Sequence, residues 1–127
     1  MKLKEVMTAI KAERFFTGDK AQPKQLMTRR GEALMKSENP QPLAEYPRPQ
    51  LVRDNYTILN GFWQYAFTET TEQPSAWDGK ILVPFSPETV LSGVERQLMP
   101  DEYLWYMREI EIEEIKGRLI LHFGACD

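Results

Sequence analysis

The apolar residues in the first part of the chain follow a helical spacing. Four of them share one face of an α-helix, at positions i, i+3, i+4 and i+7: Leu3, Val6, Met7 and Ile10. The spacing predicts a helix over residues 1–16, ended by the turn residues of 17–19. We interpret this helix as a cover for part of the domain or as a segment that frays in solvent. A membrane or partner anchor is the alternative, which its lysines favour and its glutamates oppose.

Two less regular segments follow this helix. A second helix over residues 23–37 is left open, because Gly31 costs about 1 kcal/mol relative to Ala inside a helix. Residues 40–49 hold four prolines, each of which fixes φ and biases the preceding residue toward extended geometry. We therefore expect an extended arm that leads into the next domain, and a ligand for a proline-recognition domain is the alternative.

From residue 57 onward the pattern changes to short aromatic and β-branched runs separated by turns. Four runs predict strands: residues 62–67, 80–83, 103–112 and 118–123. Residues 85–100 have no steady period and several prolines, so they are predicted to be a loop. The pattern indicates an all-β sandwich or barrel over residues 45–127, preceded by a helical and proline-rich arm over residues 1–44.

Composition narrows the classes of partner. The chain has 127 residues, a net charge of -3 and a pI near 5.3, which oppose nucleic-acid binding because phosphates need a dense positive field. No apolar run approaches the roughly 18 residues of a membrane span, and acidic residues near the N-terminus are unlike a secretory signal. A single cysteine cannot form an internal disulfide. We expect a soluble cytoplasmic protein without membrane or nucleic-acid partners.

The sequence contains few residues of the types that bind metals or catalyse reactions. One His and one Cys cannot build a zinc site, and the chain lacks a phosphate-binding glycine loop, so no metal, cofactor or catalytic residue is assigned. His122 lies in an apolar run, where a structural histidine is favoured over a catalytic base. Cys126 has no neighbour in the sequence to activate it, so a buried apolar role is favoured over a nucleophile.

Carboxylates and aromatic residues offer alternatives for glycan chemistry. Glycoside hydrolysis needs two carboxyl groups roughly 5 to 9.5 Å apart. Four glutamates alternate with or follow isoleucines as on the outer face of a half-buried strand: Glu109, Glu111, Glu113 and Glu114. Four strand aromatics suit either a core or stacking on sugar rings, with the core favoured: Trp63, Tyr65, Trp105 and Tyr106.

The order of five segments resembles one enzyme family. The segments are residues 59–65, 81–88, 91–94, 104–108 and 119–127. They resemble, in this order, the LNGxWxF/Y, IxVPFSPE, LSGV, WYxR and RLLLHFGAxD segments of family-2 glycoside hydrolases, the β-galactosidase and β-glucuronidase group. The lead-in EYPRPQLVR is also similar to the family. The match covers residues 45–127 well and 24–44 loosely, and residues 1–23 match no part of the family pattern.

The resemblance implies an incomplete jelly-roll β-sandwich of the galactose-binding type. In the family, an immunoglobulin-like domain and a TIM barrel follow, and the barrel carries both catalytic glutamates of a retaining mechanism. The jelly roll closes one side of the sugar pocket, and the resemblance places Asp127 at or near that pocket. Its carboxylate would accept hydrogen bonds from sugar hydroxyls, and a terminal surface acid is the alternative.

The sequence thus leads to three functional hypotheses. The first is the carbohydrate-binding N-terminal part of a β-galactosidase-like hydrolase that cleaves O-glycosidic bonds, inactive alone, with carbohydrate and the remainder of the parent enzyme as partners. The others are a free-standing lectin-like module and a complementation fragment that joins another chain through residues 118–123. A jelly roll has about eight strands and four are predicted here, so we expect low stability of the isolated chain.

Overall fold

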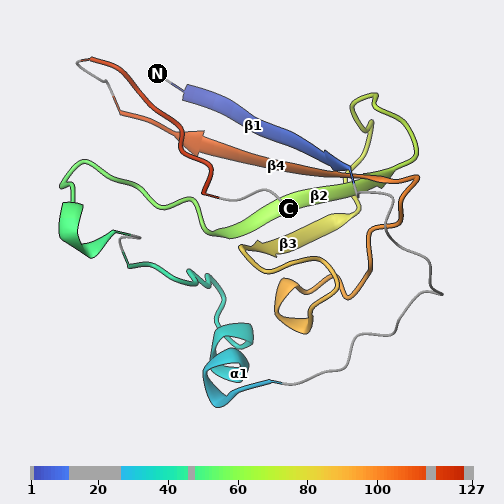
Figure 1. Cartoon of the computed structure of the whole chain (residues 1–127), viewed down its shortest axis with the longest axis horizontal. Coiled ribbons are helices and arrows are strands. Elements are labelled where there is room, and N and C mark those ends of the chain that lie inside the picture. Colours follow the sequence, from blue (N-terminus) through green and yellow to red (C-terminus); the bar gives the residue numbers. More distant parts are fainter. Residues whose placement is uncertain (1, 12–26, 46–47, 114–116, 125–127) are drawn as a thin grey trace.

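One antiparallel sheet forms the body of the protein. The computed structural model describes residues 2–11, 27–45, 48–113 and 117–124. Four strands lie in the order β1-β4-β2-β3 (Figure 1): β1 (Lys2–Lys11), β2 (Gly61–Thr68), β3 (Gly79–Val83) and β4 (Tyr103–Glu111). Helix in these residues is limited to α1 (Arg29–Met35) and two 3-10 turns, η1 (Pro49–Leu51) and η2 (Val90–Ser92). The all-β expectation is confirmed at this level.

The central strands follow the predicted pattern. β2, β3 and β4 coincide with three of the predicted strands to within one or two residues, and a long loop with η2 connects β3 to β4 as expected. Their register places Trp63 opposite Ile81, and Tyr65 opposite Tyr106. Directly opposed residues share a face, so aromatic and β-branched side chains meet across the strands.

The core lies on one face of this sheet. Trp63 and Ile81 are buried at its centre, and partly buried side chains pack around them: Leu59, Tyr65, Val83, Val94, Tyr106 and Ile110. The other face is also covered at β3, because Leu82 is only 3% exposed although its neighbour Ile81 points the opposite way. The edge strand β3 is therefore enclosed on both faces.

Helix α1 contains the glycine that was expected to interrupt it. Thr28 caps the helix, because its side-chain oxygen accepts a hydrogen bond from the Gly31 amide at 3.1 Å. Gly31 is buried, and a Cβ there would lie 3.1 Å from Cδ2 of Leu91 in η2. The glycine thus lets α1 approach the β3–β4 loop closely, and this contact offsets its low helix propensity.

The helix predicted over residues 1–16 is wrong in its described part. Residues 2–11 form β1, which pairs with β4 from Lys2 opposite Glu111 to Lys11 opposite Tyr103, with a register shift between Leu3 and Val6. The main-chain groups along β4 need hydrogen-bond partners, and this tertiary pairing overrides the helical spacing of the side chains. The predicted turn at residues 17–19 lies outside the described residues.

The strand predicted over residues 118–123 is also wrong. These residues follow the bend at Gly117 and have no regular secondary structure. Four apolar side chains in the segment are 41% to 57% exposed: Leu119, Ile120, Leu121 and Phe123. The segment has the composition of a strand but no backbone ladder with the described residues, because β1 lies along the available edge of β4.

The proline-rich arm is only partly extended. A turn interrupts residues 40–45, where Leu43 has a φ of 49°, and η1 follows after residues outside the described part. Pro40 and Pro42 are buried against the rest of the chain. Within the described ranges, no helix is long and apolar enough to cross a membrane.

Candidate functional site

The first and fourth family-like segments meet at one main-chain carbonyl. The oxygen of Leu59 accepts hydrogen bonds from Nε1 of Trp63 at 2.8 Å and from Nη1 of Arg108 at 2.6 Å. The same Nη1 atom also donates to the carbonyl oxygen of Asn60 at 3.2 Å. A residue of β4 thereby holds the chain at the entrance to β2, 49 positions earlier in the sequence.

Asn60 and Gly61 complete this arrangement, which we call the LNG junction (Leu59, Asn60, Gly61, Trp63 and Arg108). Nδ2 of Asn60 donates to the carbonyl oxygen of Pro42 at 3.1 Å and so fastens the arm to the sheet. Gly61 has a φ of +128°, and a Cβ there would lie 3.4 Å from Arg108 Nη1. Only glycine adopts this backbone at low cost. The LNG junction therefore holds the arm, the start of β2 and β4 together, and its polar atoms are used in hydrogen bonds within the protein.

The second and third family-like segments form a self-bonded loop between β3 and β4. Ser92 is fully buried, and its hydroxyl donates toward the carbonyl oxygens of Thr89 at 2.7 Å and Pro87 at 3.1 Å. The same oxygen accepts the Val94 amide at 3.1 Å. Gly93 then turns the chain with a φ of 79°. The serine and glycine of this segment therefore have structural roles.

An arginine and an aromatic pair stand where the β3–β4 loop meets β2. The Arg96 guanidinium carbon lies 3.9 Å from the ring centroid of Phe67, and the ring of Tyr65 meets Phe67 edge-on at 5.8 Å. Arg96 also pairs with Glu102, whose second oxygen accepts the Met99 amide at 3.1 Å. One face of Phe67 is thus occupied by a cation, which leaves that face closed to a sugar ring.

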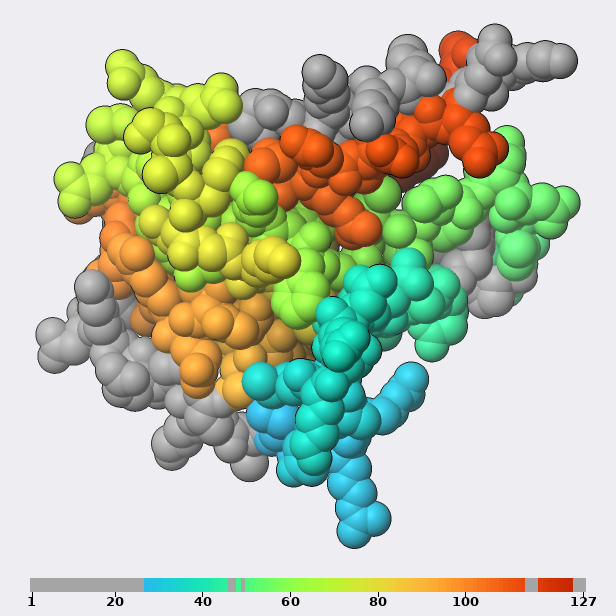
Figure 2. Space-filling view, turned by 180° about the vertical axis from the view of Figure 1, so that it is seen from behind, coloured from blue at the N-terminus to red at the C-terminus, as the bar shows by residue number. Residues whose placement is uncertain are grey.

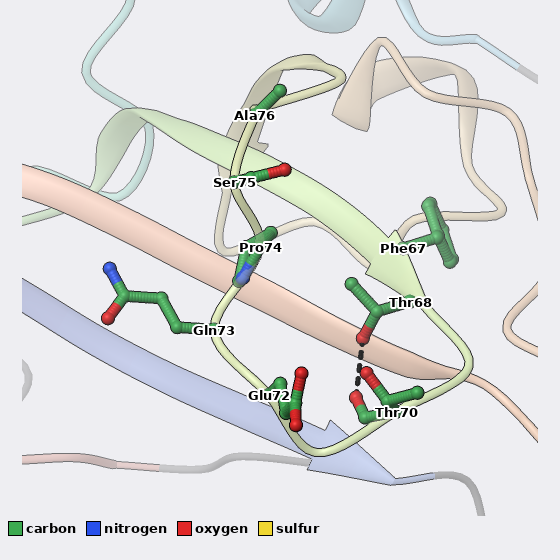
Figure 3. A pocket seen from close by; sticks show the side chains of 8 residues that line it. All are labelled: Phe67, Thr68, Thr70, Glu72, Gln73, Pro74, Ser75 and Ala76. Atoms are coloured by element: carbon green, nitrogen blue, oxygen red, sulfur yellow. Dashed lines mark hydrogen bonds between the residues drawn. The ribbon is translucent and has the colours of Figure 1, made fainter.

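An open pocket of about 420 Å³ lies in the β2–β3 loop. It is lined by the end of β2 and by that loop (Figure 3): Phe67, Thr68, Thr70, Glu72, Gln73, Pro74, Ser75 and Ala76. The Thr68 hydroxyl is already used, because it donates to the Thr70 carbonyl at 2.8 Å and accepts from Nε1 of Trp105 at 2.8 Å. The hydrogen bond from Trp105 ties the pocket to β4, and the one to Thr70 lies within the pocket loop.

The pocket offers hydroxyl, amide and carboxylate groups to solvent. Glu72, Gln73 and Ser75 are exposed, and no lysine or arginine among the residues that the structure describes lines the pocket. Such groups can exchange hydrogen bonds with a neutral polyhydroxylated ligand but cannot neutralise a phosphate. The sequence analysis missed this site, and its only signal there was the run ETTEQPS between two predicted strands.

The loop is closed by an acidic residue of the turn that precedes β3. Oδ2 of Asp78 accepts the Phe67 amide at 2.8 Å, and the Asp78 amide donates to the Tyr65 carbonyl oxygen at 2.8 Å. The carboxylate thus extends the β2–β3 ladder by one more bond beyond the pair Tyr65 and Gly79. The pocket loop is fixed at both of its ends.

The site residues expected from the sequence lie apart from this pocket or outside the described residues. Asp127 and Cys126 are in the second group. His122 is exposed on the irregular segment that follows Gly117, so the expected structural role inside a strand is not observed. Glu109, Glu111 and Glu113 are exposed as predicted, and Glu114 lies outside the described part. No group of three His, Cys, Asp or Glu side chains in the described ranges could hold a metal ion.

The four strand aromatics mostly have framework roles. Trp63 is 8% exposed and belongs to the core, as favoured from the sequence, and Tyr65 and Tyr106 pack against it. Trp105 is partly buried on the opposite face and hydrogen-bonded to Thr68.

The comparisons with known proteins found no matching family model, no matching curated protein and no matching solved structure.

Proposed function

We propose that this chain is the carbohydrate-binding, non-catalytic part of a family-2 glycoside hydrolase of the β-galactosidase type. In this proposal the sheet belongs to a galactose-binding-like jelly roll, and a catalytic barrel elsewhere supplies both glutamates. The partners are a carbohydrate and the barrel-containing part of the enzyme, and the location is the cytoplasm. Asp127 remains the proposed sugar contact of the family-like segment 119–127.

The observation that carries the proposal is the LNG junction. Segments 59–65 and 104–108 resemble family segments by sequence alone, and in the structure the Arg108 side chain of one segment donates to the main-chain oxygens of Leu59 and Asn60 in the other. Residues that recur together in a family are expected to do so when they form one structural unit. A junction of Leu59, Gly61 and Arg108 supports the view that these residues are a framework signature and not a chance match.

The chemistry of the β2–β3 pocket is compatible with a sugar. Its exposed groups are those that bind neutral hydroxyls, and the chain's net charge of -3 opposes anionic ligands. Glu109 and Glu111 of β4 are exposed on the face away from the core, where the solvated carboxylates of a half-buried strand are expected. Both points support binding by this chain and catalysis by another part of the enzyme.

Complementation tests this proposal. The chain is mixed with a family-2 glycosidase fragment that holds the barrel but lacks the jelly roll, and hydrolysis of nitrophenyl β-galactoside and β-glucuronide is measured. We expect activity in the mixture and none from either part alone. The Gly61→Ala variant, which disturbs the LNG junction, should lower the activity gained, whereas Gly93→Asn serves as a control in a glycine turn where an added Cβ meets nothing within 4 Å.

Two results would contradict the proposal. If the folded chain binds the barrel fragment and no hydrolysis follows, the role in a hydrolase is wrong. If the chain binds galactosides in an NMR titration without associating with the barrel fragment, it is a free-standing lectin-like module.

A further inference from the structure

The apolar segment 118–123 has the features of a strand that is not paired. Leu119, Leu121 and Phe123 alternate with Ile120 and His122, which is the period of a strand with one apolar face. In the structure, the segment is irregular, and its four apolar side chains are 41% to 57% exposed. In the space-filling view, this segment (red-orange) lies across the surface of the molecule (Figure 2). Such exposure is unfavourable, and it indicates that another arrangement of the segment buries these side chains.

The chain already runs in the direction that pairing with β4 would need. Figure 1 shows that the chain reverses after β4 and that residues 117–124, in red, run back in the opposite direction. Gly117 has a φ of 127°, a backbone conformation that glycine adopts at low cost where the chain bends. The edge of β4 that such pairing would use is, however, taken by β1.

We propose that residues 118–123 and β1 compete for the same edge of β4, so that the structure shows one of two mutually exclusive sheets. In the second state, Arg118 lies opposite Glu111 and the strand continues antiparallel to β4. Residues 118–123 then form a β-hairpin with β4, which precedes them in the sequence, and residues 2–11 leave the sheet. This proposal is independent of the carbohydrate-binding proposal.

The faces of β4 support this register. Leu119 would lie opposite Ile110, and Phe123 opposite Tyr106, and both β4 residues pack against the Trp63 and Ile81 core. All three apolar residues of the alternating set would therefore extend the core face. On the other face, Arg118 would lie beside the glutamates at positions 109 and 111, which is a favourable cross-strand pairing. A shift of one residue would reverse both faces, so the register is well specified.

The released N-terminal segment has a helical alternative. Its apolar residues have the helical spacing described above, although residues 2–11 form a strand in this structure. The register shift between Leu3 and Val6 shows that the pairing of β1 with β4 is interrupted. Helical spacing and an interrupted ladder both lower the cost of displacing this segment from the sheet.

Disulfide trapping in the full chain tests the exchange. Directly opposed residues of antiparallel strands have Cα atoms close enough for a disulfide. In a Cys126→Ser background, the Leu3→Cys/Ile110→Cys pair reports the observed sheet, because these positions are partners. The Ile110→Cys/Leu119→Cys pair reports the second sheet. The matched control is Ile110→Cys/Ile120→Cys, in which the second position would lie on the opposite face.

We expect both reporter pairs to cross-link and the control pair to cross-link about tenfold more slowly than the Leu119 pair. In a Thr8→Pro/Ala9→Pro background, which removes a β1 ladder donor, the Leu119 pair should form faster and the amides of 118–123 should become protected from hydrogen exchange. Equal rates for the Leu119 and Ile120 pairs in the unblocked chain would overturn the proposal, since they would mean an unpaired segment. Absence of the Leu119 cross-link would overturn it as well.

Discussion

Nη1 of Arg108 lies 2.6 Å from the carbonyl oxygen of Leu59, so that a side chain of β4 fixes the main chain just before β2. The indole of Trp63 donates to the same oxygen. A single carbonyl thus accepts one charged and one neutral donor and links a core residue to a partly buried cation. This relationship makes the junction sensitive to small changes in any of its members.

Loss of the Arg108 guanidinium should destabilise the protein. The Arg108→Ala variant removes charge-assisted hydrogen bonds to two carbonyl oxygens, and we expect a loss of about 1.5–3 kcal/mol in the free energy of unfolding. Urea unfolding followed by tryptophan fluorescence measures it. Arg108→Lys should recover part of the loss, because an ammonium keeps the charge but not the guanidinium geometry. An Ala variant as stable as the parent would show that the junction contributes nothing.

Gly61 should not tolerate a side chain. Its φ is +128°, and a Cβ added there would lie 3.4 Å from both Arg108 Nη1 and the Pro40 carbonyl oxygen. Gly61→Ala should therefore cost about 1–3 kcal/mol. The comparison is Gly93→Asn, at a φ of +79° with open space around it, where asparagine tolerates the left-handed conformation. Thermal unfolding of both variants checks this difference, and equal shifts of Tm would contradict the role assigned to Gly61.

Removal of the Ser92 hydroxyl should leave buried polar groups without partners. Ser92 is fully buried, and its oxygen serves two carbonyls and the Val94 amide, so Ser92→Ala should cost about 1–3 kcal/mol. Ser86→Ala is the control, because Ser86 is exposed and contributes its main-chain oxygen to the loop. Denaturant unfolding of the two variants should separate them, and similar midpoints would refute the assignment.

Leu43 offers a site for stabilisation. This leucine has a φ of 49° and is 62% exposed, so it combines an unfavourable backbone conformation with little burial. Leu43→Asn should raise the free energy of unfolding by about 0.5–1 kcal/mol, because asparagine enters the left-handed region more easily. Leu51→Asn, at an exposed position without a positive φ, should give no such gain. A calorimetric Tm series decides between them.

Strands β2, β3 and β4 could be predicted because the local sequence of each one favours a strand. Trp63, Ile81 and Leu104 occur in aromatic and β-branched runs bounded by turns, and such runs pack as strands in many contexts. The N-terminal strand was not predictable, since its side chains have helical spacing and only the edge of β4 makes it a strand. The failed prediction at residues 118–123 has the same origin, because one edge cannot hold two strands.

The candidate site was less predictable than the fold. The pairing of Arg108 with Leu59 involves a main-chain acceptor, and every residue has one, so the sequence contains no mark of it. The pocket depends on the path of the β2–β3 loop, which Asp78 fixes by accepting the Phe67 amide. The role of Ser92 likewise depends on burial among carbonyl oxygens that no side-chain pattern records.

The strand order also has a kinetic consequence. Tyr65 pairs with Gly79 across a short connection, whereas Lys2 pairs with Glu111 near the other end of the chain. The first pair is 14 positions apart and the second 109, so closing the roughly eightfold longer loop costs roughly 1.8 kcal/mol more in chain entropy before any contact compensates for it. The β2–β3 hairpin should therefore form early in folding, β4 should join it next, and β1 should arrive last. During synthesis on the ribosome, β1 emerges before the other three strands, so its pairing with β4 is delayed until β4 has been made.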